Sequence, residues 1–209
     1  LLGSPDNEGF AHWLRTGQGA QDAPDGGTPI GVLQARTRTS GIDWAGAMRL
    51  IGTAGRRLTT AFWDADNAPT LVARYKAVPG KAIQVEKRVA QFTSRDVASG
   101  DVPATAVAKV AAAPAWREAL AASVQAWEAE WARTDAVIEA DDEAQIAMRF
   151  NLFQMLVAAP RHDERVNIGA KTLSGFGYRG HAFWDTEIFM LPLFTYTAPH
   201  IARNLLNYR

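Results

Sequence analysis

The spacing of hydrophobic residues changes from a period near two to a helical period close to residue 100. Before this point, short runs alternate apolar and polar residues, as strands do when one face is buried. The runs are Ile30–Thr37, Ala45–Ile51, Leu58–Trp63, Thr70–Tyr75 and Ile83–Phe92. Turn signals such as residues 25–27 and 78–80 separate them, and no helical pattern intervenes. The pattern predicts an antiparallel β-sandwich over residues 1–100, with further strands upstream.

From Thr105 onward, apolar residues recur at helical spacing. The first stripe predicts a linker helix, within residues 101–138, that packs against the sandwich or the helices that follow. Its members are Trp116, Leu120, Val124, Trp127 and Trp131. The alanine-rich stretch 104–122 is also a good helix former.

Three further helices are predicted after this linker. The first runs from about Asp141 to Ala158, the second from about Asp185 to Tyr196, and the third from Pro199 to Tyr208. The side chains expected inside the first of them are Ile146, Phe150, Phe153, Met155 and Leu156. Strands followed by helices place the chain in the α+β class.

Composition narrows the possible partners. The 209 residues carry 22 Lys and Arg against 22 Asp and Glu, so no basic field favours nucleic acid or an anionic membrane. There is no Cys, which excludes disulfides, zinc–thiolate sites and Cys nucleophiles and suits a reducing compartment. No apolar run reaches the length of a membrane span, and the N-terminus lacks the form of a signal peptide. We expect a cytoplasmic protein, and the start at Leu1 suggests a piece of a longer one.

The stretch 175–187, GFGYRGHAFWDTE, is the best candidate for a site. Its three glycines suit neither a helix nor a strand, and it brings aromatic rings together with an Arg, a His and two carboxylates. Residues 175–180 match the G-x-G-x-x-G fingerprint of dinucleotide-binding proteins, but no buried strand precedes them and His200 stands where an acid is required. We therefore reject a dinucleotide site, and the four His show no metal-ligand spacing.

Three segments carry a resemblance to a known family: RFNLFQ (149–154), AKTLSGFGYRGHAFWDTEIFMLP (170–192) and AR.LL.YR (202–209). They resemble glycoside hydrolase family 65, which includes maltose, trehalose, kojibiose and nigerose phosphorylases and related hydrolases. In addition, VEKRVAQFTSRD (85–96) looks like the last sandwich strand of such enzymes. The resemblance implies a β-sandwich, a helical linker and, over residues 139–209, the first helices of an (α/α)6 barrel.

The resemblance also implies a reaction. Family phosphorylases cleave an α-glucosidic bond with inversion, using inorganic phosphate as co-substrate and no cofactor, and release β-glucose 1-phosphate. The family's general-acid glutamate and its phosphate contacts lie beyond Arg209, so we expect no catalytic residue in this chain and no activity from it alone. Full-length family members are usually homodimers. The alternatives are an α-glucosidic hydrolase of the same family, or a non-catalytic module for carbohydrate binding or assembly.

By the same resemblance, Trp184 and Asp185 line the subsite for the non-reducing glucose, with Arg179 and His181 as weaker candidates. Each has a structural alternative: Trp184 as a core aromatic, Asp185 as a helix N-cap, and His181 as a hydrogen-bonded structural residue. Arg179 is expected to pair with Asp185 or Glu187, and Glu187 to form a structural salt bridge or contact a loop backbone. Arg149, Asn151 and Gln154 are expected to tie helices to loops.

Overall fold

The structure is a computed structural model that describes residues 13–25, 27–52, 59–63, 70–139, 141–173 and 177–209. The chain forms two compact units, Leu1–Glu118 and Ala119–Arg209, each described by itself below.

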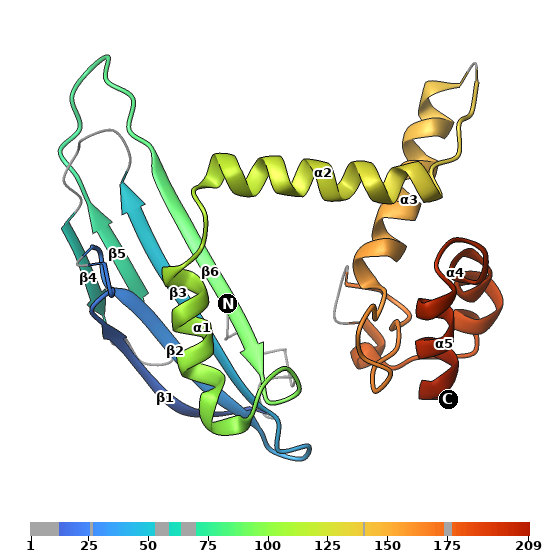
Figure 1. Cartoon of the computed structure of the whole chain (residues 1–209), viewed down its shortest axis with the longest axis horizontal. Coiled ribbons are helices and arrows are strands. Elements are labelled where there is room, and N and C mark those ends of the chain that lie inside the picture. The colour runs from blue at the N-terminus through green and yellow to red at the C-terminus, as the bar shows by residue number, and fades with distance from the viewer. Residues whose placement is uncertain (1–12, 26, 53–58, 64–69, 140, 174–176) are drawn as a thin grey trace. The chain divides into compact units, whose positions relative to one another are not determined.

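The first unit contains a four-stranded antiparallel sheet with the strand order β1-β2-β3-β6 (Figure 1). Its strands are β1 (Trp13–Gln21), β2 (Ile30–Thr37), β3 (Asp43–Gly52) and β6 (Val85–Thr93). A two-stranded antiparallel sheet of β4 (Thr59–Trp63) and β5 (Thr70–Arg74) accompanies it. The antiparallel strands expected from the sequence are confirmed.

Strand β1 was not predicted from the sequence. Its residues, WLRTGQGAQ, include two glycines and few apolar positions, and the strand is largely exposed. It nevertheless pairs with β2 along its length, with a bulge between Arg15 and Gly17. Hydrogen bonding to a neighbouring strand, rather than burial of a face, holds this edge strand in place.

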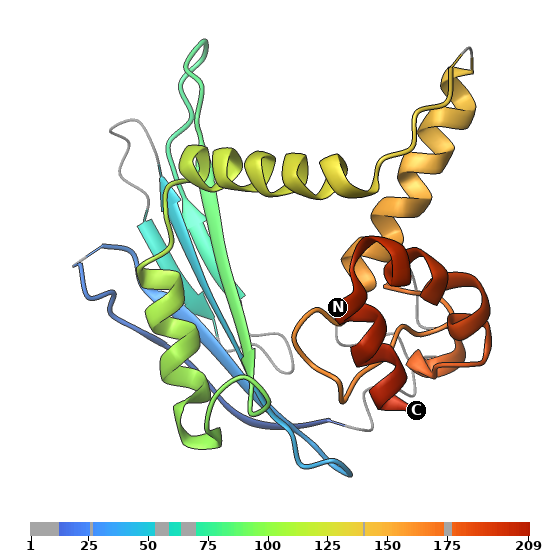
Figure 2. The same ribbon diagram turned by 45° about the vertical axis from the view of Figure 1, so that its right-hand side comes forward.

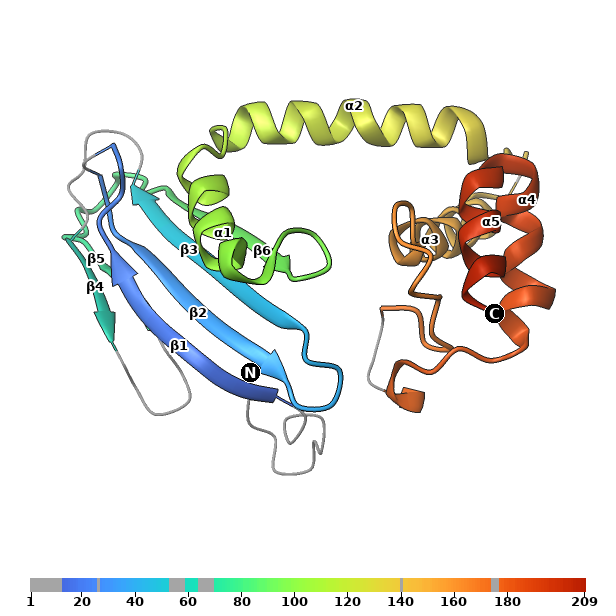
Figure 3. The ribbon, with the colours of Figure 1, turned by 60° about the horizontal axis from the view of Figure 1, so that its bottom comes forward.

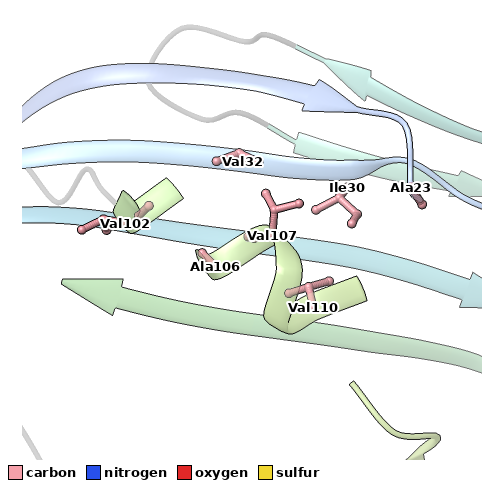
Figure 4. Close-up of a cluster of buried hydrophobic side chains, with 9 residues drawn as sticks. Ala23, Ile30, Val32, Val102, Ala106, Val107 and Val110 are labelled. Atoms are coloured by element: carbon pink, nitrogen blue, oxygen red, sulfur yellow. The ribbon is translucent and has the colours of Figure 1, made fainter. Parts of the chain in front are cut away.

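Helix α1 (Val102–Ala111) covers one face of the four-stranded sheet (Figures 2 and 3). Ala45 and Ala47 are fully buried beneath it, and their small side chains let the helix approach the sheet closely. Figure 4 shows how side chains from the sheet and the helix meet in this core. The core consists of Ala23, Ile30, Val32, Ala45, Ala47, Val102, Ala106, Val107 and Val110.

A buried arginine fastens the connection between β1 and β2 to this sheet. The side chain of Arg49, only 4% exposed, donates from Nη1 and Nη2 to the Asp25 carboxylate at 3.0 and 2.8 Å. Its Nε donates to Thr28 Oγ1 at 3.2 Å, and that hydroxyl donates to the carbonyl of Leu50. These hydrogen bonds hold the pKa of Asp25 below its usual range. Burial of the Arg49 charge is compensated by these hydrogen bonds to Asp25 and Thr28.

Replacing Gly27 with alanine is expected to destabilise the first unit by about 1–3 kcal/mol. A Cβ at this position would overlap Arg49 Nη2, and the guanidinium cannot move without loosening its bonds to Asp25. Gly19→Ala is the matched control, because a Cβ on that residue of β1 meets no atom within 4 Å. Urea denaturation of both variants measures the difference. Equal stabilities would contradict the role given to Arg49.

The alanine-rich stretch forms two helices rather than one. Helix α1 ends at Ala111, and α2 (Trp116–Thr134) begins after Pro114, which cannot continue a helix from the preceding turn. The remaining helices are α3 (Asp142–Ala158), α4 (Leu191–Thr197) and α5 (Pro199–Tyr208). Helices after strands are thus confirmed, whereas the assignment of residues 139–209 to the first helices of an (α/α)6 barrel and the predicted domain boundaries remain predictions.

The second unit has its own core, where α4 and α5 pack side by side (Figures 1 and 3). Phe194 and Ile201 are fully buried there, and Leu156 of α3 and Ile168 of the following loop join them. Trp127 and Met155 pack against this cluster from α2 and α3.

The expected burial of two apolar stripes is wrong in large part. Trp116, Leu120 and Val124 are 40–49% exposed, and only the end of the α2 stripe packs, where Trp127 stacks on Trp131 with ring centroids 5.8 Å apart. Of the α3 side chains expected inside, Leu156 is buried and Met155 packs on the core, but the others are exposed: Ile146, Phe150 and Phe153. Periodicity tells which residues share a face, not which face meets another element.

No helix in the described ranges is both long enough and apolar enough to span a bilayer.

Candidate functional site: the Tyr178–Met190 segment

The site segment is anchored to the loop that precedes it. The amide of Ala170 donates to the carbonyl of His181 at 3.2 Å, and Gly169 lies so close to Gly180 that a Cβ on it would sit 3.2 Å from the Gly180 oxygen. Tyr178 and Gly180 both have left-handed backbones, with φ of 60° and 74°. Glycine adopts this conformation freely, but at Tyr178 it persists only where surrounding contacts impose it, and such strained residues concentrate at functional sites.

A π-helical turn, Thr186–Met190, leads from this loop into α4. The amide of Leu191 donates to the carbonyl of Thr186, five residues back. Pro192 has no N–H and its ring would crowd the carbonyl of Ile188, so a turn wider than an α-helix suits this sequence. Inserted π-turns are frequent at functional sites.

Thr186 fixes the start of this turn. It is fully buried, and its hydroxyl donates to the carbonyl of Ile168 at 3.2 Å. Ile168 itself is buried in the core of the second unit. The turn that carries the candidate residues is therefore attached directly to the core, a contact that sequence reasoning missed because no local pattern joins residues eighteen positions apart.

Trp184 is not a core residue. Its side chain is 67% exposed, and its ring lies 6.0 Å from that of Phe189, which is also exposed. Tyr178 and Phe183 form a second, edge-to-face pair with centroids 5.4 Å apart. The structural alternative for Trp184 is thus wrong. An accessible indole face can pack against the C–H face of a sugar ring.

Asp185 does not cap the helix. It directly precedes Thr186, but its side chain makes no capping hydrogen bond and its backbone is already helical, with φ −63° and ψ −26°. Its Oδ1 is enclosed and has no hydrogen-bond partner among the residues described. The capping alternative is therefore wrong, and the role of Asp185 in sugar binding stays a prediction.

Glu187 forms the salt bridge expected of it, and its partner is Arg209. The guanidinium donates from Nε and Nη2 to the two Glu187 oxygens at 2.8 and 3.0 Å. These hydrogen bonds hold the pKa of Glu187 below its usual range and raise that of Arg209, to which the charge of Asp185 adds a further rise. Sequence reasoning missed this role of Arg209, although Arg209 closes one of the segments that carried the resemblance.

The Glu187–Arg209 pair predicts a pH-dependent stability for the second unit. The folded pKa of Glu187 lies below its unfolded value, so the contribution is complete above the unfolded pKa and is lost as pH falls through the folded one. We expect Glu187→Gln to be less stable than the wild-type chain at about pH 6 and the gap to shrink by about pH 3. Denaturant titrations at both pH values measure it. A gap that is equal at both values would mean that the charge contributes nothing.

The remaining residues singled out in the sequence differ in the contacts that the structure gives them. His181 is exposed, and its backbone bonds to Tyr178 and Ala170, but its imidazole forms no hydrogen bond within the described ranges. The side chain of Arg179 lies outside the described residues. Arg149 ties α3 to the preceding loop, as expected, through two bonds to Asp135 at 3.0 and 2.6 Å. Asn151 instead donates to Ala147 within its own helix.

Two successive stretches of the chain match two domains of one enzyme family. Residues 2–130 match the N-terminal domain of glycosyl hydrolase family 65, and residues 149–209 match its central catalytic domain. The chain belongs to glycosyl hydrolase family 65. Within this family, the exposed Trp184 and the adjoining Asp185 lie in the part of the chain that matches the catalytic domain.

Several family 65 phosphorylases are similar to the chain. It is 35% identical to a kojibiose phosphorylase of Halothermothrix orenii over 99% of this chain and 27% of that protein. It is 37% identical to a nigerose phosphorylase of Lachnoclostridium phytofermentans over 62% of this chain and 18% of that protein. A solved structure of a putative kojibiose phosphorylase from the human microbiome has the same fold, with a TM-score of 0.75 over 95% of this chain and 25% of that one, at 21% identity. The chain thus spans about a quarter of the length of such relatives.

Proposed function

We propose that the whole protein is an inverting disaccharide phosphorylase, and that this chain contributes Trp184 and Asp185 to the subsite for the non-reducing glucose. The protein would cleave an α-glucosidic bond with inorganic phosphate and release β-glucose 1-phosphate. Membership of the family and the phosphorylase names of the relatives support the reaction class. The observation that carries the site is the exposed Trp184 ring, which precedes in sequence an Asp185 whose Oδ1 has no hydrogen-bond partner among the described residues.

The chemistry of the two side chains suits this role. An indole face packs against the C–H face of a pyranose, and a carboxylate accepts hydrogen bonds from neighbouring hydroxyl groups. Inverting hydrolysis requires a base to activate water, but phosphate is already anionic, so one acid that protonates the leaving oxygen suffices. Family membership further supports three expectations for the whole protein: an (α/α)6 barrel, a homodimer and a cytoplasmic location.

The test is phosphate-dependent release of glucose 1-phosphate from α-glucosyl disaccharides, namely maltose, trehalose, kojibiose and nigerose. The assay is run with and without phosphate, on this chain and on the whole protein. Release by the whole protein only with phosphate would support the proposal. Free glucose formed equally without phosphate would identify a hydrolase and overturn it, as would the absence of any product from all four sugars.

A further inference from the structure

We infer that Glu187 and Arg209 are positioning residues, which hold the π-turn in the orientation that lets the side chains of Trp184 and Asp185 contact the same sugar. The inference rests on the proposed function for the identity of the ligand, but its geometric content does not. Neither residue is assigned a contact with substrate. Both act through the backbone that carries the two candidate ligands.

The pair gives the π-turn a second attachment, in addition to that of Thr186. Thr186 fixes the turn to the core through the carbonyl of Ile168, and Glu187, the next residue, fixes it to the end of α5 through Arg209. Two consecutive residues are thus attached to different elements. Rotation of the turn about its own axis would have to break one attachment or the other.

The backbone transmits this restraint to Trp184. The amides of Glu187 and Ile188 both donate to the carbonyl of Trp184, at 3.2 and 3.4 Å, and the amide of Thr186 donates to the carbonyl of Phe183 at 3.2 Å. The orientation of the Trp184 peptide is therefore set by the turn that Glu187 anchors. An exposed aromatic ring binds a sugar face well only if its direction is fixed before the sugar arrives.

Arg209 suits this task better than a lysine would. Its planar fork meets both carboxylate oxygens at once, which fixes direction as well as distance. The guanidinium also lies close enough to Asp185 for the charges to interact. Loss of the fork would therefore disturb both the Trp184 backbone and the field at the Asp185 carboxylate.

The test labels the 209-residue chain with 5-fluorotryptophan and follows the fluorine resonance of Trp184, assigned by its absence in Trp184→Phe. Arg209→Ala removes the fork, and Arg209→Lys keeps the charge alone. Arg149→Ala is the matched control, because Arg149 makes an equivalent bidentate pair with Asp135 in the same unit. D-glucose is the titrant, and thermal denaturation reports stability.

We expect Arg209→Ala to shift the Trp184 resonance and to weaken glucose binding about tenfold, with Arg209→Lys intermediate and Arg149→Ala unchanged in both readouts. Faster amide exchange over Thr186–Met190 in Arg209→Ala would support the same conclusion. If Arg209→Ala does not fold, Glu187→Gln takes its place.

The two proposals fail in different ways. If the wild-type chain binds no glucose, the sugar subsite is not formed in this chain, yet a Trp184 resonance that moves in Arg209→Ala and not in Arg149→Ala would still establish the positioning role. An unmoved resonance, with a melting temperature lowered as much as in Arg149→Ala, would overturn the inference and reduce the pair to an ordinary structural contact.

Discussion

Replacing Trp184 or Asp185 with alanine is expected to lower kcat/KM of the whole protein by about 10²–10³-fold, roughly 3–4 kcal/mol of transition-state stabilisation. The Trp184→Ala variant would lack the indole face that packs on the glucose ring. The Asp185→Ala variant would lack the carboxylate that accepts charge-assisted hydrogen bonds from the glucose hydroxyls. The measurement is steady-state phosphorolysis of the preferred disaccharide, with a denaturation curve for each variant.

Stability separates this expectation from a structural role. Trp184 is 67% exposed and Asp185 makes no capping bond, so neither substitution should change the melting temperature by more than ~2 °C. Tyr196→Ala is the control for removal of an exposed aromatic ring in the same unit, since Tyr196 is 87% exposed. Wild-type kinetics in both site variants would remove Trp184 and Asp185 from the glucose subsite.

Phe194→Ala is expected to destabilise the second unit by about 3–5 kcal/mol. Phe194 is 0% exposed and lies in the cluster that joins α4 and α5 to Leu156 and Ile168, so alanine would leave a cavity that helices on several sides cannot close. Because Ile168 also accepts the hydrogen bond of Thr186, the loss should extend to the π-turn and its amides.

The comparison within one helix makes this test sharp. Tyr196→Ala, two residues further along α4, should change the unfolding free energy by no more than about 0.5 kcal/mol, because the ring contacts little. Urea denaturation followed by circular dichroism measures both. If the two variants lay within 1 kcal/mol of each other, the core assigned to this unit would be wrong.

Local pattern determined most of the secondary structure. The alternating run Ile30–Thr37 and the helix Pro199–Tyr208 have the predicted bounds, because burial of one face and a proline at the first turn leave clear signals. Strand β1 gave no such signal, because its partner β2 rather than a core holds it. The break between α1 and α2 near Pro114 was not predicted, although the proline stands in the sequence.

The sequence by itself determined the antiparallel strands followed by helices, the family, and the segment that carries Trp184 and Asp185. Each of these depends on short-range spacing or on a contiguous motif, which one chain displays in full. Only the tertiary structure decided that Trp184 is exposed, that Asp185 caps nothing, that Thr186 reaches the core, and that Glu187 pairs with Arg209. Those facts depend on contacts between residues far apart in the chain, and periodicity cannot say which face of an element such contacts will cover.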